Sequence, residues 1–495
     1  MSTALVWFRR DLRIADQPAL AAAVARHDHV VPVYVFAPDE EVPWAPGAAS
    51  RWWLHHSLAA LGASLEALGA PLILRHGASL AELRALVRDT RADAVYWTRL
   101  YEPAVVARDR HVKRALRDDG LQVESFNAAL LCEPFETRTT SGQPYRVFTP
   151  FFRSGAAKLA ASLASGRAPV AGPTRLVPVK PQPASLPLDA LGLLPKIGWD
   201  RGFYAEWTPG EDGAHARLEA FCDGGLSEYR AGRDLPAIDA TSRLSAALHF
   251  GEVSPLSLVA RLERLAAERH AAGLRANAEW FVRELWWREF AHHLLFHFPR
   301  TPEEPLVERF AQLQWRRRTE YAADLVAWQR GRTGIPIVDA GMRQLWQTGW
   351  MHNRVRMLVA SFLTKNLLVP WQEGARWFWD TLVDASLANN TLGWQWTAGC
   401  GADAAPYFRI FNPVLQGRKF DADGAYVRRY VPELARLSEV HAPWEAASDL
   451  LDTGGVRLGH SYPRPVADLA ASRARALEAY EPVRNARGAP AAKDS

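Results

Sequence analysis

Three side chains of different chemistry fall on one face of a helix predicted near the middle of the chain. In the segment Arg283–Phe290, helical spacing brings Glu284, Trp287 and Arg288 together. A carboxyl group, an aromatic plane and a cation would then share one surface, which suits hydrogen bonding and stacking. The alternative is an amphipathic helix with core tryptophans and solvated charges, which is the commoner origin of such patterns.

A second predicted helix repeats this mixture of polar and aromatic groups. The same spacing puts four of its residues on one stripe: Trp350, Asn353, Arg354 and Met357. A third polar and aromatic segment, Asp384–Trp396, leads into Pro406–Pro413. Tryptophan is concentrated in this part of the chain, because 12 of the 20 tryptophans lie between Trp280 and Trp396.

Hydroxyl groups gather at another predicted helix start, Thr241–Ser245. Hydroxyls and free backbone N–H groups that converge there would suit a pyrophosphate. A simple capping sequence explains the same residues at least as well when they are taken alone.

The first 130 residues or so alternate short apolar runs with helical patterns, which predicts a doubly wound α/β domain on a parallel sheet. The predicted strands are Ala4–Phe8, Val30–Phe36, Pro71–Leu74, Ala94–Trp97 and Leu121–Phe126, and the predicted helices are Pro18–Arg26, Ser50–Leu68, Leu80–Arg88 and Ala104–Arg117. No G-x-G-x-x-G turn follows the first strand, which disfavours a nicotinamide site.

We predict the α/β domain over residues 1–132, a linker over 133–213, a helical domain over 214–480 and a flexible tail over 481–495. Prolines from Pro173 to Pro187 predict a linker without long helices. Helical periodicity dominates after residue 214. A chain of 495 residues suits two domains.

The composition limits the classes of protein that fit. No apolar run approaches the roughly 20 residues of a membrane helix, and a strand follows Met1 where an export signal would need a basic and apolar stretch. Three separated cysteines suit a reducing compartment. A net charge of +5 permits attraction to phosphate backbones but proves little alone. We expect a cytoplasmic, nucleoid-associated monomer without a membrane contact.

From Val6-Trp7-Phe8-Arg9-Arg10-Asp11-Leu12-Arg13 through Tyr430, and through all the segments above, the chain resembles the photolyase and cryptochrome family. It is most like a class I cyclobutane pyrimidine dimer DNA photolyase. The resemblance implies an N-terminal α/β domain, an all-α C-terminal domain that holds FAD, and light-driven repair of UV-damaged DNA. The active flavin would be the reduced form.

The resemblance implies a set of FAD-binding residues: Tyr229, Thr241, Ser242, Arg243, Leu244, Ser245, Phe281, Arg356, Asp384, Ala385, Ser386 and Asn390. Arg356 would pair with Asp384, and Asn390 would lie near flavin N5, so both would set the redox behaviour. The family usually has an acid at the position of Ser386. A serine there can donate a hydrogen bond but carries no charge.

The resemblance also implies how the lesion is bound. Trp287 and Trp396 would replace the stacking lost by a flipped-out dimer. Glu284 and Asn353 would hydrogen-bond the carbonyl edges of the dimer, and the catalytic set would be Glu284, Asn353, Met357 and Asn390. The residues that face DNA would be Arg233, Glu284, Trp287, Arg288, Asn353, Arg354, Trp396, Arg409 and Gln416, with Lys419 beside them. Six-four photolyases carry histidines at the positions of Asn353 and Met357, so the cyclobutane branch is favoured.

Three tryptophans match the electron-transfer chain of the family: Trp394, Trp371 and Trp315. Core packing would explain any one of them alone. Glu289, His293 and His297 have a spacing that could bind a metal on a helix, but no further ligands are visible and we predict no metal site. A second, antenna chromophore is possible; folate is doubtful because Ala104 and Val105 replace an Asn-Glu pair.

Two other functions remain open. A cryptochrome would use the same flavin and tryptophans to signal to a protein partner, although the tail is short for a signalling extension. A flavin electron-transfer protein that has lost repair is the second alternative, and the altered Ser386 keeps it open.

Overall fold

The computed structural model describes residues 1–269, 272–403 and 408–486, so Pro406, Tyr407 and residues 487–495 lie outside the described residues. The chain divides into two compact units. Unit 1 comprises Met1–Arg230, Ala240–Pro299 and Leu382–Ala388, and unit 2 comprises Ala231–Asp239, Arg300–Thr381 and Asn389–Ser495. These limits differ from the boundaries at residues 132 and 213, which stay a prediction.

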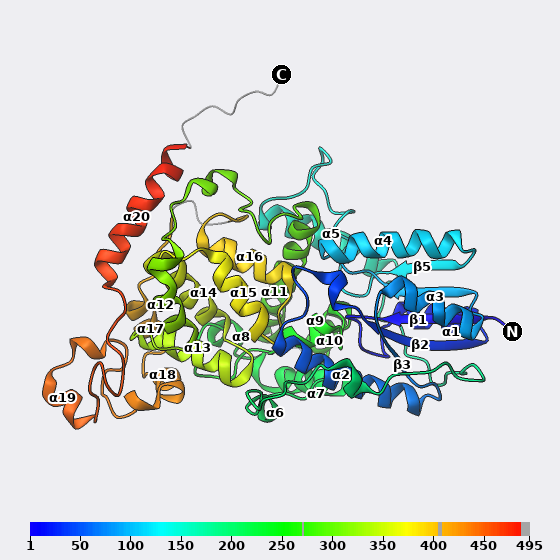
Figure 1. The fold of residues 1–495 in the computed structure, drawn as a ribbon, viewed down its shortest axis with the longest axis horizontal. Helices are drawn as coiled ribbons and strands as arrows, with labels where there is room; N and C mark the ends of the chain where they lie inside the picture. Colours follow the sequence, from blue (N-terminus) through cyan, green and yellow to red (C-terminus); the bar gives the residue numbers. More distant parts are fainter. Residues whose placement is uncertain (270–271, 404–407, 487–495) are drawn as a thin grey trace, which may run out of the picture. The chain divides into compact units, whose positions relative to one another are not determined.

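A five-stranded parallel sheet forms the centre of the α/β part of unit 1 (Figure 1). Its strand order is β3-β2-β1-β4-β5, and the strands are β1 Thr3–Phe8, β2 His29–Phe36, β3 Ile73–His76, β4 Ala94–Thr98 and β5 Gln122–Phe126. Every predicted strand is present, with ends that shift by one or two residues. The order places β1 between β2 and β4, where all six of its residues are buried.

Helices cover both faces of this sheet, which confirms the doubly wound class. They are α1 Pro18–Arg26, α2 Ala48–Ala67, α3 Ser79–Thr90 and α4 Pro103–Asp118. Side chains alternate across a strand, so Leu5 and Trp7 point to the same face. They share a core with Leu83 of α3 and Leu116 of α4.

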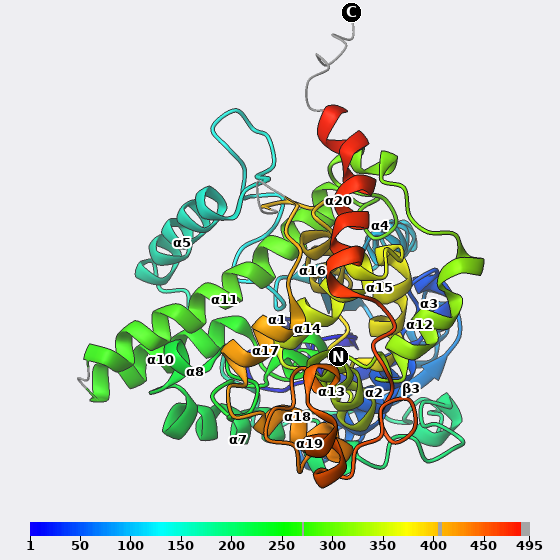
Figure 2. The same cartoon turned by 90° about the vertical axis from the view of Figure 1, so that its left-hand side faces the viewer.

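The predicted linker contains a long helix, which corrects the sequence-based expectation for that segment. Helix α5 spans Phe148–Ala164, 17 residues, and packs against α11 (Figure 2). The prolines that suggested an irregular chain begin at Pro173, after the helix ends. Within α5, Pro150 lies in the first turn, where a missing N–H costs nothing.

The other helices of unit 1 come after α5 in the chain. They are α6 Phe203–Glu206, α7 Glu211–Ala220, α9 Ser245–Phe250, α10 Pro255–Arg269 and α11 Ala272–His297, with a π-helical turn η3 at Phe221–Gly225. Helix α8, Tyr229–Gly232, lies where the division between the units passes.

Unit 2 is helical throughout its described residues, apart from connecting turns. Its helices are α12 Arg318–Gln329, α13 Pro336–Thr348, α14 Asn353–Ser361, α15 Trp371–Thr381, α16 Leu387–Ala398, α17 Pro413–Phe420, α18 Ala425–Tyr430, α19 Ser448–Thr453 and α20 Leu469–Asn485. Helix α16 begins in the last segment of unit 1. Helix α20 continues to Asn485, so the tail predicted to be flexible from residue 481 begins inside a helix.

The residues after β1 fasten the sheet to the helical part of unit 1. Arg13 is buried, and its guanidinium donates to the carbonyl of Gly251 at 2.8 Å and to that of Ala128 at 3.1 Å. Gly251 has a φ of +67°, and a Cβ there would lie 2.2 Å from the carbonyl oxygen of Arg10. Only glycine permits both this backbone conformation and this close approach.

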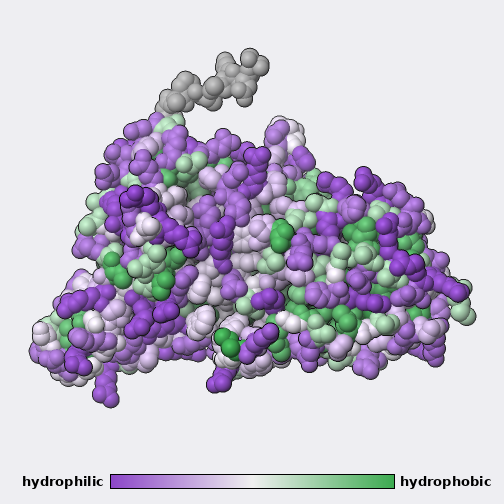
Figure 3. Space-filling model, viewed as in Figure 1, coloured by the Kyte–Doolittle hydropathy of each residue, from purple (hydrophilic) through white to green (hydrophobic). Residues whose placement is uncertain are grey.

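The surface seen in Figure 3 is mostly hydrophilic, with hydrophobic residues in small groups. Within the described residues, no helix has the length and hydrophobicity to cross a membrane.

Candidate flavin and DNA site

Helix α11 carries the first group of predicted site residues in unit 1. Glu284 and Trp287 are both half-buried. One face of the Trp287 indole is covered by the ring of Phe148, because the ring centroids are 3.7 Å apart and the planes differ by 5°. Trp287 is therefore fixed on one side while part of its surface stays accessible.

Arg288 is bound to backbone carbonyls inside unit 1, and its assignment to a DNA-facing rim stays a prediction. Its side chain is 12% exposed, and its guanidinium donates to the carbonyls of Ala129 at 2.6 Å and Leu248 at 3.2 Å. Burial lowers the pKa of Arg288. The side chain therefore ties α11 to neighbouring backbone inside unit 1.

Two of the predicted flavin residues meet in an aromatic cluster. Tyr229 and Phe281 are buried, with ring centroids 5.5 Å apart, and Phe221 contacts both at 5.6 and 5.0 Å. The sequence analysis did not select Phe221, which lies in the π-helical turn η3. The cluster fixes the start of α8 against α11.

The segment Thr241–Ser245 ends at the first residue of α9, as predicted. Thr241 and Ser242 are half-buried and Ser245 is exposed. Arg243 has a φ of +52°, and its guanidinium pairs with Glu206 at 2.8 Å over the ring of Trp207. A carboxylate thus engages this cation, and the hydroxyl and backbone N–H groups of the segment are further donors that suit a phosphate.

The segment before α16 is buried in unit 1. Asp384, Ala385 and Ser386 are all less than a tenth exposed. Ser50 of α2 donates to the carbonyl of Leu382, at 3.4 Å, near the start of this segment. An acid at residue 386 would be a second buried carboxylate beside Asp384, and its desolvation would cost free energy. Ser386 has a neutral hydroxyl group there, which avoids this cost.

In unit 2, the start of α14 presents the second polar stripe. His352 caps this helix, and its Nδ1 accepts the backbone N–H of Arg354 at 3.2 Å. Burial lowers the pKa of His352 to about 4, which keeps the ring neutral and able to accept. Asn353 is exposed and Met357 is half-buried. Asn353 is therefore available to a ligand.

The two arginines of α14 have partners inside unit 2. Arg354 pairs with Asp234 at 2.7 Å and lies over the ring of Phe420. Arg356 donates from Nε to the carbonyl of Met351 at 2.7 Å. The predicted pair of Arg356 with Asp384 joins residues of different units and stays a prediction.

The three predicted electron-transfer tryptophans are graded in exposure within unit 2. Trp394 and Trp371 are each 2% exposed, and Trp315 is half-buried. The backbone N–H of Arg316 donates to the carbonyl of Leu368 at 3.1 Å, which holds the Trp315 segment against the chain that leads into α15. Trp394 and Trp371 are thus equally buried and Trp315 is nearer to solvent, and their role in electron transfer stays a prediction.

Trp394 is held by aromatic neighbours that the sequence analysis did not select. Phe378 contacts it with ring centroids 5.0 Å apart, and Trp328 does so at 6.2 Å. Gly374 of α15 faces the indole so closely that a Cβ would lie 2.0 Å from Cη2 of Trp394. The sequence hints at the contact between Gly374 and Trp394 only through the position of Gly374 near Trp371 in α15.

The other residues assigned to the lesion and DNA lie in unit 2. Asn390 of α16 donates to the carbonyl of Ala375 at 2.9 Å, and Trp396 is half-buried. Arg409 and Lys419 are exposed, whereas Arg233 and Gln416 are half-buried. These positions agree with contact to a ligand at the surface and do not test it.

Two histidines of α11 hold the backbone of the linker. Nε2 of His293 accepts the N–H of Tyr145 at 3.0 Å, and Nε2 of His297 lies 3.0 Å from the carbonyl of Pro134. Burial lowers the pKa of His293 to about 3 and raises that of Glu289 to about 7. Oε2 of Glu289 accepts the N–H of Cys132 at 3.1 Å, so each of the three residues has a backbone partner before α5.

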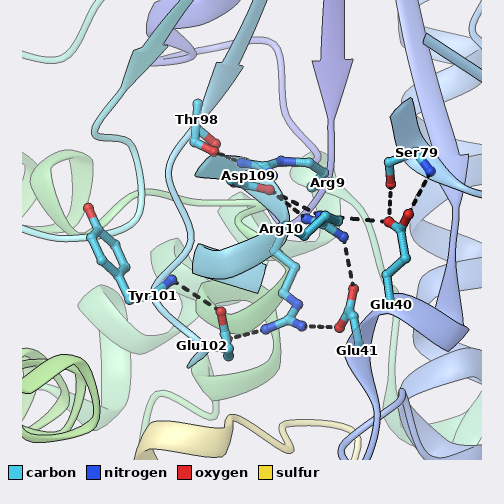
Figure 4. A network of polar contacts seen from close by, with 10 residues as sticks. Arg9, Arg10, Glu40, Glu41, Ser79, Thr98, Tyr101, Glu102 and Asp109 are labelled. Carbon is cyan, nitrogen blue, oxygen red and sulfur yellow. Dashed lines mark hydrogen bonds and ion pairs between the residues drawn. The ribbon is translucent and has the colours of Figure 1, made fainter. Parts of the chain in front are cut away.

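Ion pairs cross the edge of the sheet at the carboxyl end of β1, where open α/β sheets commonly bind ligands (Figure 4). Arg10 pairs with Glu102 and, at 2.7 Å, with Glu41, while Arg9 pairs with Asp109 at 2.6 Å. Although burial alone would raise it, the pKa of Glu102 is lowered because Arg10 stabilises the carboxylate. The charges satisfy one another, and the network does not identify an antenna chromophore.

Comparison with known proteins decides the family. Residues 4–171 match the model described as DNA photolyase, and residues 280–482 match that of the FAD binding domain of DNA photolyase. A deoxyribodipyrimidine photo-lyase of Agrobacterium fabrum is 50% identical over 483 residues, which are 97% of this chain and 98% of the relative. The chain belongs to the photolyase and cryptochrome family.

This photolyase-family chain is also similar to a cryptochrome. Cryptochrome-2 of Arabidopsis thaliana is 38% identical over 494 residues, covering 97% of this chain and 79% of the relative. Among solved structures, a bacterial class III photolyase from Agrobacterium tumefaciens has a TM-score of 0.91 and 48% identity, with 98% of each chain covered. A class I assignment of the present chain stays a prediction.

The residues of the predicted flavin site have the donor chemistry that FAD needs. Hydroxyl groups at Thr241, Ser242 and Ser245 suit phosphate oxygens, and the buried Asp384 suits a polar ring edge. Together with the match to a FAD binding domain, this donor set supports FAD as the cofactor.

Proposed function

We propose that this protein uses light to split cyclobutane pyrimidine dimers in DNA. One observation carries the proposal: α11 presents a carboxyl group and an indole fixed on one face, Glu284 and Trp287, on a partly exposed surface. A flipped-out pyrimidine needs an aromatic plane in place of its lost neighbours and a polar group for its Watson–Crick edge. The named photo-lyase relative supports the same reaction.

The residues that would hold FAD are Tyr229, Thr241–Ser245, Phe281, Arg356, Asp384–Ser386 and Asn390. When bound and reduced, this cofactor supplies the light-absorbing electron donor. A second, light-harvesting chromophore belongs to the proposal without an identity, and folate is not favoured beside Ala104 and Val105.

Glu284 would recognise the edge of the dimer. A carboxylate accepts the N–H of a pyrimidine ring, and a protonated carboxyl group can also donate to a carbonyl. Asn353 supplies both a donor and an acceptor, and its exposure leaves them accessible. Because the negative charge on a dimer develops at its carbonyl oxygens, donors at this edge would stabilise the reacting state more than the ground state.

Two groups of residues would perform the remaining tasks. Trp394, Trp371 and Trp315 would carry an electron from solvent inwards, which keeps the cofactor reduced between reactions. Arg409 and Lys419 are exposed cations that would contact the phosphate backbone. Arg288 stays in the predicted DNA-facing set, and its guanidinium also donates to two backbone carbonyls. We expect the enzyme to act as a cytoplasmic, nucleoid-associated monomer.

A cryptochrome function is the second candidate, because Cryptochrome-2 aligns along almost the whole chain. The tryptophan path would serve both functions, so it does not separate them. Glu284 and Asn353 separate them, since a receptor that binds no lesion has no need for polar groups at a dimer edge.

The test compares two lesions. Purified protein with chemically reduced FAD is illuminated with an oligonucleotide that carries either a thymine dimer or a six-four photoproduct. We expect repair of the dimer alone. Repair of the six-four lesion would refute the cyclobutane assignment, and repair of neither lesion by protein with bound FAD would favour the receptor.

A further inference from the structure

The stacked pair of Phe148 and Trp287 joins the linker to the proposed lesion site. The two rings lie face to face, with centroids 3.7 Å apart and planes 5° from parallel. Phe148 is 1% exposed, whereas Trp287 is half-buried. An indole has two faces, so Phe148 takes one and leaves the accessible surface on the rest of the ring.

Phe148 is itself held in place by its neighbours in unit 1. The Phe152 ring lies nearly parallel to it at 5.8 Å, and Phe290 meets it edge-on at 5.9 Å. The guanidinium of Arg283 lies 5.3 Å from the centre of the Phe148 ring. Phe148 therefore has little freedom to tilt or withdraw, and it transmits this restriction to the indole.

The register of α5 along α11 adds a second restraint. Gly155 faces Trp286, and a Cβ at Gly155 would lie 2.3 Å from Cζ3 of that indole. Any larger residue would push the two helices apart. Because Phe148 is the first residue of α5, this tight contact two turns later fixes the distance of Phe148 from Trp287.

We propose that Phe148 is a positioning residue for recognition of damaged DNA: it holds the Trp287 indole in the plane on which a flipped-out base stacks. The inference rests on the proposed function. A ring that is already ordered loses less side-chain entropy when a ligand stacks on it, so affinity for the flipped lesion rises. Undamaged DNA, which presents no flipped base, gains nothing from this order.

The test uses Phe148→Leu, which keeps an apolar side chain but removes the flat ring. Its matched control is Phe151→Leu, on the same helix, a buried ring that packs on Trp286 and His293. The dissociation constant is measured in the dark, with the full-length holoprotein, for a duplex with one thymine dimer and for the same duplex undamaged. Bound FAD and the thermal midpoint are recorded for each variant.

We expect Phe148→Leu to weaken dimer binding about tenfold, which equals about 1.4 kcal/mol. Binding to undamaged duplex and the content of FAD should stay as in the wild type, and Phe151→Leu should change dimer binding less than twofold. In a Trp287→Ala background, Phe148→Leu should have no further effect, because there is no indole left to position.

Two results separate the failures. If Trp287→Ala weakens dimer binding and Phe148→Leu does not, the positioning role of Phe148 is wrong. If Trp287→Ala leaves dimer binding unchanged, the proposed role of Trp287 itself is wrong. Equal losses for damaged and undamaged duplex would also overturn the inference. Should Phe148→Leu fail to fold, Phe148→Met, which lacks a ring but keeps more volume, is judged by the same results.

Discussion

Substitution of Gly374 by alanine should displace Trp394. An added Cβ would lie 2.0 Å from Cη2 of the indole, whereas ordinary contact begins near 3.4 Å, so the ring must retreat by more than an ångström. Trp394 is 2% exposed and has Phe378 and Trp328 beside it, which leaves little room for that movement. Overpacking of this kind costs roughly 1–3 kcal/mol.

The change also removes a glycine from the interior of α15, which alone would stabilise the helix by roughly 0.5–1 kcal/mol. The net loss in the free energy of unfolding should therefore lie between about 0 and 2.5 kcal/mol. Gly393→Ala is the matched control, because Gly393 lies in α16 next to Trp394 and a Cβ there meets nothing within 4 Å. That variant should be as stable as the wild type or slightly more stable.

Two assays read the outcome of these substitutions. Thermal unfolding of the holoproteins should place Gly374→Ala below the wild type and Gly393→Ala at or above it. Photoreduction of oxidised FAD should be slower in Gly374→Ala alone, since only there has the indole moved. Wild-type stability together with wild-type photoreduction in Gly374→Ala would refute the reasoning that this glycine fixes Trp394.

Three further predictions test other residues. Glu284→Ala should lower light-driven repair about 10–100-fold through the loss of a hydrogen bond from or to a charged group while FAD stays bound, and unchanged repair would remove Glu284 from the mechanism. Trp394→Phe should block photoreduction of oxidised FAD yet retain repair after chemical reduction; normal photoreduction would reject the assigned electron path. Burial raises the pKa of Glu252 to about 7, while its Oε1 accepts from the Trp53 indole at 2.8 Å and the Gly210 N–H at 2.7 Å. Between pH 4.5 and 7 the carboxyl group of Glu252 is therefore protonated in the folded protein but ionised in the unfolded chain. The free energy of unfolding then falls as the pH rises through that range, by about 3 kcal/mol at most. Unfolding measured at pH 5 and 8 should show a smaller fall for Glu252→Gln than for the wild type, and parallel falls would contradict the shifted pKa.

The strands of the α/β part were predictable because their signal is local. Val30–Phe36 is a short run of β-branched and aromatic residues between helical patterns, and it forms β2. Helix α5 was not predicted, because the prolines that suggested an irregular linker all lie after residue 164, where this helix has already ended. Composition over a long window cannot show where, within that window, a helix ends.

The sequence offered residue types for a candidate site, whose roles stay predictions, but not the direction in which each side chain points. Helical spacing shows that Glu284, Trp287 and Arg288 lie near one another, yet it does not show which of them faces the interior. The carbonyls of Ala129 and Leu248 draw Arg288 inwards, and they come from segments far away in sequence. The stacking of Phe148 on Trp287 also joins segments that are far apart in sequence. It could not be predicted, because no periodicity relates the linker to α11.

The light dependence of dimer repair tests the central claim most directly. Reduced holoprotein is mixed with an oligonucleotide that carries one thymine dimer, and half of the sample is illuminated with blue light while the other half stays dark. The account predicts restored thymines only in the illuminated half. An intact dimer in both halves, with FAD bound and photoreducible, would contradict repair and leave the receptor function in its place.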